Sequence, residues 1–384
     1  MLTRATSATR RVRLGQRLRE TVSRVTATAW RRWFLDRHAE FWLRELGTTW
    51  SLAAPRARVV DLIDDTADTR TLVLDPGRRW PGHRAGQYVP IEIEVDGTRV
   101  RRCYSISSGS AAPGARRIGI TVRCVPGGRA STALHQLCRG AVVGLGTPAG
   151  DFMLDAPVAP KLLLVGGGSG ITPIMAMIRD LADRRRGETG HARDGRGVIV
   201  IHGSRNAGDA IFGAELASLA ARFDWLRIHA RRDDDAERGR LDARGLSTLV
   251  PDLADREIFV CGPLGLIEVV TQAARDVGAL HRVHQERFVA PAARTAGAGG
   301  AVTVALLRTG IEVVASGPGP LLAQLERAGQ HPVFGCRMGI CHSCRCRKLR
   351  GTVEDSVTGV VSSEPDQDIR LCVSLARSDL ELAL

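Results

Sequence analysis

The feature that most constrains this chain is a run of cysteines near its carboxyl end. Cys336, Cys341 and Cys344 stand in a C-x4-C-x2-C array, and Cys372 follows downstream. Four thiolates in this arrangement, three from one tight loop and one from a distant strand, have the plant-type spacing for a [2Fe–2S] cluster. The sequence therefore predicts a metal site with these four cysteines as its ligands.

The loop around these cysteines has the composition that such a cluster needs. Its backbone must wrap closely so that N–H groups point at the sulfurs, and Gly335 and Gly339 permit this path because they lack a Cβ. Structural zinc sites usually pair two short knuckles, and only one is present here. A disulfide framework is disfavoured because the sequence carries no secretory signal. Cys346 is a spare thiol, since only Cys344 gives the plant-type gap.

The composition indicates a multidomain globular protein in a reducing compartment. A chain of 384 residues is long enough for two to four domains, and it contains no apolar run of about 18 residues that would span a membrane. The formal net charge is +13, yet every basic residue except Lys161 and Lys348 is Arg. This bias weakens a nucleic-acid interpretation, because a high isoelectric point alone is a poor signal. We expect a cytoplasmic protein that does not bind nucleic acid.

Residues 1–56 form a basic, aromatic-rich extension. The first 50 residues carry eleven Arg against four acids, together with four of the six Trp of the chain. Over residues 28–46, aromatic and apolar residues recur at helix-like spacings between Arg residues, which predicts a helical N-terminal extension. One interpretation is a helix packed on the chain's own next domain. Another is a helix lying on the inner face of the membrane, which would make the protein peripheral there, and a transit peptide is a third.

The rest of the chain changes its pattern three times. Short alternating strands with Gly, Pro and Asp turns fill residues 57–156 and predict an antiparallel β-barrel. Continuous apolar runs with helical stretches between them fill 157–290 and predict a doubly wound α/β domain. Residues 291–300 are a small-residue linker, and 301–384 contain the cysteine array, for which we expect a β-grasp ferredoxin-like domain.

A short motif in the predicted barrel has the residue types that bind a flavin. Arg102, Tyr104 and Ser105 lie at a strand end, and the alternation of a strand puts Arg102 and Tyr104 on one face. An Arg can clamp a phosphate, an aromatic plane can stack on a flavin ring, and a hydroxyl can hydrogen-bond a ring nitrogen. Further along, Gly128 leads into a helix whose first turn holds Ser131, which suits a pyrophosphate. Each signal is weak when taken alone.

A glycine-rich loop follows the first predicted parallel strand. The segment from Val165 to Pro173 reads Val-Gly-Gly-Gly-Ser-Gly-Ile-Thr-Pro, and its last residue is favoured in the first turn of a helix. The loop places glycine backbone and a helix N-terminus where the phosphates of a nucleotide bind. Cys261, Gly262 and Pro263 end a later strand at the carboxyl edge, where open α/β sheets bind ligands. Cys261 is either a buried core thiol or a residue that faces a nicotinamide.

Taken in this order, the motifs resemble those of the ferredoxin–NADP⁺ reductase superfamily. More narrowly, the chain looks like the subgroup with a C-terminal plant-type ferredoxin domain, whose members are reductases for oxygenases, hydroxylases and fatty-acid desaturases, including the electron-transfer partner of stearoyl-CoA desaturase. The resemblance covers about residues 57–384. The matched motifs are Arg102, Tyr104 and Ser105; Gly127, Gly128, Arg129, Ser131 and Leu134; Gly166 to Pro173; Cys261 to Pro263; and Glu286, Arg287 and Phe288.

The resemblance implies roles for these residues. Arg102 would bind the flavin phosphate, Tyr104 would stack on the isoalloxazine, and Ser105 would hydrogen-bond near N5. The long diphosphate turn looks like that of members with FAD rather than FMN, and Thr172 and Cys261 would place the nicotinamide. The implied cofactor-binding residues are Arg102, Tyr104, Ser105, Gly128, Ser131, Gly166, Gly167, Gly168, Gly170, Thr172, Ser204, Arg205, Cys261, Gly262, Pro263 and Phe288. Those implied nearest the reacting rings are Tyr104, Ser105 and Cys261.

The coenzyme prediction depends on the end of the second parallel strand. Ser204 and Arg205 follow that strand, where the adenosine ribose of a dinucleotide lies in this type of fold. A hydroxyl and an Arg there suit the 2′-phosphate of NADPH, whereas an acidic residue would have favoured NADH. We therefore expect NADPH, with NADH as the alternative.

The implied activity is that of an NAD(P)H-dependent oxidoreductase that converts two-electron into one-electron transfer. Electrons would pass from NADPH to FAD, then to the [2Fe–2S] cluster, then to a partner. We expect that partner to be a fatty-acid (acyl-CoA) desaturase or a membrane hydroxylase. One alternative is the reductase component of a soluble Rieske, aromatic or steroid oxygenase, and another is an iron–sulfur redox sensor. A basic surface would steer an acidic acceptor, although arginine bias explains the same residues equally well. Its residues are Arg337, Arg345, Arg347, Lys348 and Arg350.

Overall fold

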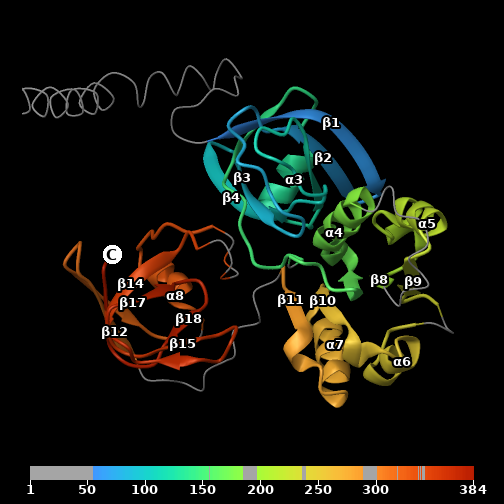
Figure 1. The fold of residues 1–384 in the computed structure, drawn as a ribbon. Coiled ribbons are helices and arrows are strands. Elements are labelled where there is room, and N and C mark those ends of the chain that lie inside the picture. Colours follow the sequence, from blue (N-terminus) through green and yellow to red (C-terminus); the bar gives the residue numbers. More distant parts are fainter. Residues whose placement is uncertain are drawn as a thin grey trace, which may run out of the picture.

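The structure is a computed structural model, and it describes residues 55–154, 156–184, 197–235, 239–288, 301–317, 319–335, 337, 339 and 342–384. Three sheet-containing units follow one another along the chain (Figure 1). The helix predicted over 28–46 and the linker predicted over 291–300 lie outside the described residues. Among the described residues, no helix is both long enough and apolar enough to cross a membrane.

The first unit is a six-stranded antiparallel sheet in the order β4-β3-β6-β1-β2-β5. Its elements are β1 (Arg56–Thr66), β2 (Thr69–Asp75), β3 (Tyr88–Val95), β4 (Thr98–Ser105), β5 (Ile118–Arg123), α3 (Arg129–His135) and β6 (Val142–Leu145). A bridge between Ile106 and Ile120 joins the two edges of the sheet and closes it. Alternate residues such as Leu72 and Leu74 fill the interior, so the predicted barrel is confirmed.

The second unit is a parallel five-stranded sheet in the order β11-β10-β7-β8-β9. Its strands are β7 (Lys161–Gly167), β8 (Gly197–Ser204), β9 (Leu226–Arg232), β10 (Glu257–Cys261) and β11 (Val283–Glu286). Its helices are η2 (Gly168–Gly170), α4 (Ile171–Arg184), η4 (Ala207–Asp209), α5 (Gly213–Arg222), α6 (Ala243–Leu249), η5 (Leu253–Asp255), α7 (Leu264–Asp276) and η6 (Leu280–Arg282). Separate apolar clusters lie on the two faces, one with α4 and α5 and one with α6 and α7, as expected for a doubly wound domain.

The third unit is a mixed sheet in the order β13-β12-β19-β14-β17, with a smaller sheet β16-β15-β18 beside it. Its elements are β12 (Val302–Leu306), β13 (Ile311–Ala315), α8 (Leu321–Arg327), β14 (Arg345–Arg350), β15 (Val353–Asp355), β16 (Val361–Ser362), β17 (Gln367–Arg370), β18 (Ser374–Ala376) and β19 (Leu380–Leu382). The apolar face of α8 packs into one core with the strands and with Cys344 and Cys372. One helix crossing a mixed sheet matches the predicted β-grasp arrangement.

The basic surface predicted around the cysteine array is largely neutralised. Arg337 pairs with Glu326 at 2.6 Å, and Arg347 pairs with Asp366 at 2.6 Å. Arg345 and Arg350 also have acidic partners, Asp368 and Glu381. Each exposed pair cancels its own charge, so these arginines offer an acceptor little net positive field.

Lys348 does not belong to any surface, so its placement in the predicted basic patch is wrong. It is 0% exposed, and its ammonium donates to Gly351 O at 2.8 Å and to Glu364 O at 2.6 Å. The strand alternation of β14 turns this side chain inward together with Cys346. The buried ammonium therefore joins two turns of the cluster domain.

We predict that Lys348→Met destabilises the cluster domain. The thioether fills similar space but leaves two buried carbonyl groups without a donor, each of which costs about 1–3 kcal/mol. The expected result is a thermal midpoint lowered by more than about 5 °C, followed through the loss of visible absorbance from the bound cluster.

The chain's other lysine supplies the control. Lys161 is 28% exposed and pairs with Asp252 and Asp255 at the surface, so Lys161→Met should cost less than about 1 kcal/mol. A Lys348→Met protein that melts at or above the wild-type temperature would contradict the buried-ammonium account.

Candidate functional site

The flavin motif lies on β4 as the alternation predicted. Arg102 is paired with Ile91 and Tyr104 with Val89 across β3, so both side chains share one face of the sheet. Ser105 is paired with Tyr88 and lies on the opposite face. Burial raises the pKa of Tyr104 well above its ordinary value, so the phenol stays neutral and presents an uncharged ring.

Ser105 carries an unused hydroxyl. The residue is 4% exposed, and its Oγ is buried without a hydrogen-bond partner among the described residues. A buried polar atom without a partner is costly, which points to a group that the chain itself does not supply. A flavin ring nitrogen is such a group, so the observation fits the predicted role of Ser105.

The predicted diphosphate turn has the close backbone approach that its glycines suggested. A Cβ on Gly128 would lie 2.6 Å from Ser131 Oγ and 2.9 Å from Val125 O, which excludes any side chain there. The Ser131 hydroxyl accepts from Val125 N–H and donates to Gly128 O, each at 3.1 Å. Ser131 therefore holds the turn at the start of α3, and the lack of a side chain at Gly128 lets the turn close tightly.

The glycine-rich loop between β7 and α4 packs directly on the loop after β10. A Cβ on Gly170 would lie 2.2 Å from Cys261 O, and one on Gly166 would lie 2.8 Å from Ile171 Cα. Gly262 has φ +157°, and a Cβ there would lie 3.0 Å from Gly167 N.

Two further members of the predicted coenzyme set stand at the same edge of the sheet. The Thr172 hydroxyl donates to Ser169 O at 2.9 Å and closes the first turn of α4. A Cβ on Gly167 would lie 2.8 Å from Pro263 Cδ, so these two loops are also in contact. The structure therefore gathers at this edge the members Gly166, Gly167, Gly168, Gly170, Thr172, Cys261, Gly262 and Pro263.

Cys261 lies beside an acid that the sequence motif did not single out as functional. In the parallel pairing of β10 and β11, Cys261 stands next to Glu286. Cys261 is fully buried, and burial raises its thiol pKa well above the ordinary value. Glu286 is 7% exposed, burial raises its pKa to about 8, and its Oε2 has no hydrogen-bond partner among the described residues. A neutral thiol and a protonated carboxyl therefore stand together at the predicted nicotinamide site.

A cavity of about 540 Å³ lies between the three units. It is lined by Tyr88 of the barrel, by Phe152 of the segment after the barrel, by His284 and Glu286 of β11, and by Gly339 and His342 of the cysteine loop. Phe288, predicted to bind a cofactor, is half-buried and packs against the core of the nucleotide domain, and its role stays a prediction.

The described part of the cysteine loop has the crowded backbone predicted for it. Gly339 has φ +78°, and a Cβ there would lie 2.9 Å from a methyl group of Val373. Its N–H donates to Cys372 Sγ at 3.2 Å, which is the backbone-to-sulfur contact expected around an iron–sulfur cluster. The N–H of Leu371, which directly precedes Cys372, donates to Cys344 O at 3.1 Å. This bond joins the backbone segments that carry the predicted ligands Cys344 and Cys372. Both are buried.

The other two predicted ligands, Cys336 and Cys341, lie outside the described residues. Cys346, predicted to be a spare thiol, is 5% exposed on β14, and burial raises its pKa to about 11. Its Sγ lies 3.6 Å from Arg347 O.

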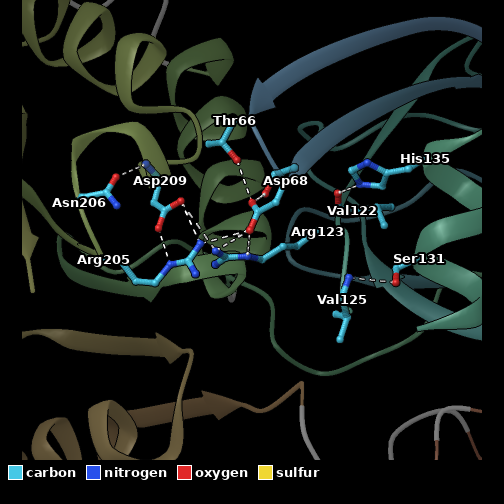
Figure 2. A network of polar contacts seen from close by, with 11 residues as sticks. Thr66, Asp68, Val122, Arg123, Val125, Ser131, His135, Arg205, Asn206 and Asp209 are labelled. Carbon is cyan, nitrogen blue, oxygen red and sulfur yellow. Dashed lines mark hydrogen bonds and ion pairs between the residues drawn. The ribbon is translucent and has the colours of Figure 1, made fainter. Parts of the chain in front are cut away.

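The predicted 2′-phosphate residues are already engaged. Ser204 Oγ donates to Asn206 O at 3.0 Å. Arg205 binds Asp209 through Nε and Nη2, and Nη2 also reaches Asp68 of the barrel at 3.2 Å (Figure 2). Arg123 joins the same group from β5, at 2.8 Å from Asp68.

Sequence reasoning missed four residues near these sites, Asp68, Arg123, Asp209 and Glu286. Only Glu286 carried a signal, its place in the Glu-Arg-Phe motif. Hydrogen bonds from Thr69 and Arg123 outweigh the effect of burial and lower the pKa of Asp68, so its carboxylate is charged.

The comparisons agree with this arrangement. The chain matches an oxidoreductase FAD-binding domain over residues 57–154, an oxidoreductase NAD-binding domain over 164–272 and a 2Fe-2S iron-sulfur cluster binding domain over 304–377. It is 38% identical to an NADPH oxidoreductase of Mycobacterium tuberculosis, covering 87% of this chain and 85% of the relative. It is 31% identical to the glycine betaine monooxygenase reductase subunit of Pseudomonas aeruginosa, covering 86% of this chain and 96% of the relative.

Among solved structures, the chain is similar to phthalate dioxygenase reductase, described as a modular structure for electron transfer from pyridine nucleotides to [2Fe-2S]. The identity is 25%, the TM-score is 0.59, and the match covers 86% of this chain and 97% of that one. The chain therefore belongs to the ferredoxin–NADP⁺ reductase superfamily, in the group that carries a C-terminal 2Fe-2S domain. It is an NAD(P)H oxidoreductase with FAD and a [2Fe–2S] cluster.

We predict a pH-dependent stability difference at Glu286. Because its pKa is about 8 when folded and 4.5 ordinarily, the folded protein holds a proton that the unfolded chain releases. The stabilisation from that proton is complete below about pH 4.5 and is lost as the pH rises toward 8. Glu286→Gln mimics the protonated form and does not lose this stabilisation. The midpoint of Glu286→Gln minus that of wild type should therefore grow by several degrees as the pH rises from about 5 to about 8.5.

The exposed Glu268 on the neighbouring helix α7 provides the matched control. Glu268→Gln removes the same charge without burial, so its midpoint should keep a constant offset from wild type. If the midpoint difference between Glu286→Gln and wild type also stays constant across this pH range, the Glu286 carboxyl is ionised in the folded protein.

Proposed function

We propose that the chain is the NADPH-dependent reductase component of an oxygenase system, and that its cluster delivers electrons singly to the oxygenase. The observation that carries this proposal is the cavity shared by the three units. Residues of the barrel, the nucleotide domain and the cysteine loop face one another across about 540 Å³, with Tyr88, Glu286 and His342 among them. The domains assigned to two-electron transfer and the domain assigned to one-electron transfer therefore border the same cavity within one chain.

The chain's own residues position the cofactors. FAD, when bound, takes two electrons together from the nicotinamide coenzyme and releases them one at a time. Arg102 is assigned to the flavin phosphate, the neutral Tyr104 ring to stacking, and the orphaned Ser105 hydroxyl to a ring nitrogen. Gly128 and Ser131 form the diphosphate turn.

The nicotinamide is assigned to the edge formed by the glycine-rich loop and the loop after β10. Thr172 and Cys261 lie at that edge, and the close contact of Gly170 with Cys261 O fixes the distance between the loops. A protonated Glu286 next to Cys261 supplies a donor for a neutral polar group such as a carboxamide. No acid or base is required to take a proton from a substrate in this scheme.

The proposed coenzyme is NADPH rather than NADH. Ser204 and Arg205 follow β8 at the position where the adenosine ribose is read in this fold. The M. tuberculosis relative is named as an NADPH oxidoreductase, which supports the same preference. Asp209, whose carboxylate binds Arg205, is the feature that favours NADH, because an acid near the ribose suits a free 2′-hydroxyl.

The proposed acceptor is an oxygenase component rather than the desaturase that the sequence first suggested. Two of the relatives are named for an oxygenase system, the glycine betaine monooxygenase reductase subunit and phthalate dioxygenase reductase. The test is NADPH oxidation coupled to oxygen uptake with purified oxygenase components, compared with a desaturase in vesicles. Substrate-dependent turnover with an oxygenase supports the assignment, and turnover with the desaturase alone contradicts it.

The proposed cluster ligands are Cys336, Cys341, Cys344 and Cys372. We predict that Cys344→Ser or Cys372→Ser abolishes the paramagnetic resonance signal of the reduced cluster. NADPH-driven reduction of ferricyanide, which can take electrons from the flavin, should persist. Reduction of cytochrome c, which takes single electrons from the cluster, should fall at least tenfold.

Cys346→Ser is the matched control, because Cys346 is a neighbouring buried thiol outside the proposed ligand set. It should retain the signal and both activities. Loss of the cluster in Cys346→Ser, together with its retention in Cys344→Ser, would reverse the ligand assignment.

A further inference from the structure

Asp68 forms a polar contact between the barrel and the nucleotide domain. It lies in the turn between β1 and β2, and its Oδ1 accepts from Thr66 Oγ1 at 3.0 Å and from Thr69 Oγ1 at 2.9 Å. These two bonds orient the carboxylate, so that Oδ2 points away from its own hairpin toward Arg123 and Arg205 (Figure 2). A single acid thus receives two guanidinium groups, one from each domain.

Arg123 is held so that part of its guanidinium faces the glycine-rich loop. Its Nε and Nη2 both bind Asp68 Oδ2, at 2.9 and 2.8 Å. Its Nη1 makes no hydrogen bond with the described residues and lies 3.5 Å from the position of a Cβ on Gly168. Gly168 has φ +54° and stands at the start of η2. An unused N–H donor is therefore held directly over the loop to which the coenzyme phosphates are assigned.

Arg205 reaches the same carboxylate from the other domain. Its Nη2 bonds Asp68 at 3.2 Å and Asp209 at 3.0 Å, and its Nε also binds Asp209. Its Nη1 makes no hydrogen bond with the described residues. The side chain is 60% exposed, so this face of the guanidinium is open to a ligand.

We infer that Asp68 is a positioning residue that holds Arg123 and Arg205 for the phosphate groups of the dinucleotide. Arg123 would meet the pyrophosphate at the glycine loop, and Arg205 would meet the phosphate on the adenosine ribose. The inference rests on the proposed coenzyme site and adds that the flavin domain helps to build it. Fixed guanidinium groups lose little conformational freedom when a phosphate binds, which favours affinity.

An account based on net charge alone predicts a different effect of these acids on phosphate binding. The cluster of Arg123, Arg205, Asp68 and Asp209 has two positive and two negative groups, so it is neutral as a whole. Replacing either acid by its amide makes the cluster more positive, which would strengthen anion binding if only charge mattered. Positioning predicts the opposite sign for Asp68, because its loss frees the guanidinium of Arg123, which otherwise has Asp209 only at 3.9 Å, and removes one of the bonds that hold Arg205. The two accounts therefore separate in a pair of variants with the same change in charge.

The test compares Asp68→Asn with Asp209→Asn in the FAD-loaded full chain. Asp64→Asn is the control, because Asp64 pairs with Arg70 in the same hairpin away from the cluster. Calorimetry measures the binding of 2′,5′-ADP and of 5′-ADP, and steady-state kinetics separates KM from kcat with NADPH and ferricyanide. A further variant, Arg123→Gln, is combined with Asp68→Asn.

The inference predicts that Asp68→Asn weakens 2′,5′-ADP binding about tenfold, or about 1.4 kcal/mol, and raises KM for NADPH with little change in kcat. Asp209→Asn should weaken binding less than Asp68→Asn, because Arg123 keeps both of its bonds to Asp68, and Asp64→Asn should match wild type. In the Arg123→Gln background, the effect of Asp68→Asn should shrink, because part of its effect acts through that arginine.

Asp68→Asn that binds as tightly as wild type, or more tightly, overturns the inference and leaves the coenzyme site standing. Wild-type protein that binds neither nucleotide overturns the proposed coenzyme site and the inference with it. Equal weakening by Asp68→Asn and Asp64→Asn would also overturn the inference, because it would trace the loss to the hairpin rather than to the cluster.

Discussion

The nucleotide half of this protein depends on one close backbone contact, the packing of the glycine-rich loop against the loop after β10. Between Gly170 and the carbonyl oxygen of Cys261 there is room for a hydrogen atom only, since a Cβ would lie 2.2 Å from that oxygen. Any side chain there would force the start of α4 away from the end of β10. The helix N-terminus, Thr172 and Cys261 would then no longer share one edge of the sheet.

The barrel and the cysteine loop both lie next to this edge of the parallel sheet. The segment around Phe152 brings the barrel against Phe259 of β10, with ring centroids 5.5 Å apart. The cysteine loop approaches from the third unit, and the shared cavity lies between them. Two of the buried side-chain atoms without a hydrogen-bond partner among the described residues belong to predicted site residues or their neighbours, Ser105 Oγ in the barrel and Glu286 Oε2 on β11. An unsatisfied polar atom that faces the shared cavity, such as Glu286 Oε2, is expected where a cofactor supplies the partner.

Much of this was predictable from sequence, because the informative residues form short contiguous motifs. The barrel, the parallel sheet and the common face of Arg102 and Tyr104 follow from strand periodicity. Contacts between distant segments were not predictable. Asp68 and Arg205 are 137 residues apart, and the burial of Lys348 was hidden within an arginine-rich run. The raised pKa of Glu286 depends on its burial on β11, which results from the tertiary packing and which no local pattern encodes.

The central claim is that electrons pass from the coenzyme through FAD to the [2Fe–2S] cluster within this one chain. Anaerobic rapid mixing of the purified protein with NADPH tests it, with flavin absorbance followed in time and the cluster followed by paramagnetic resonance in frozen samples. The account predicts that flavin bleaching comes first and that the cluster signal grows as electrons leave the flavin. A flavin that bleaches while the cluster stays oxidised, or a protein that holds no cluster, would contradict it.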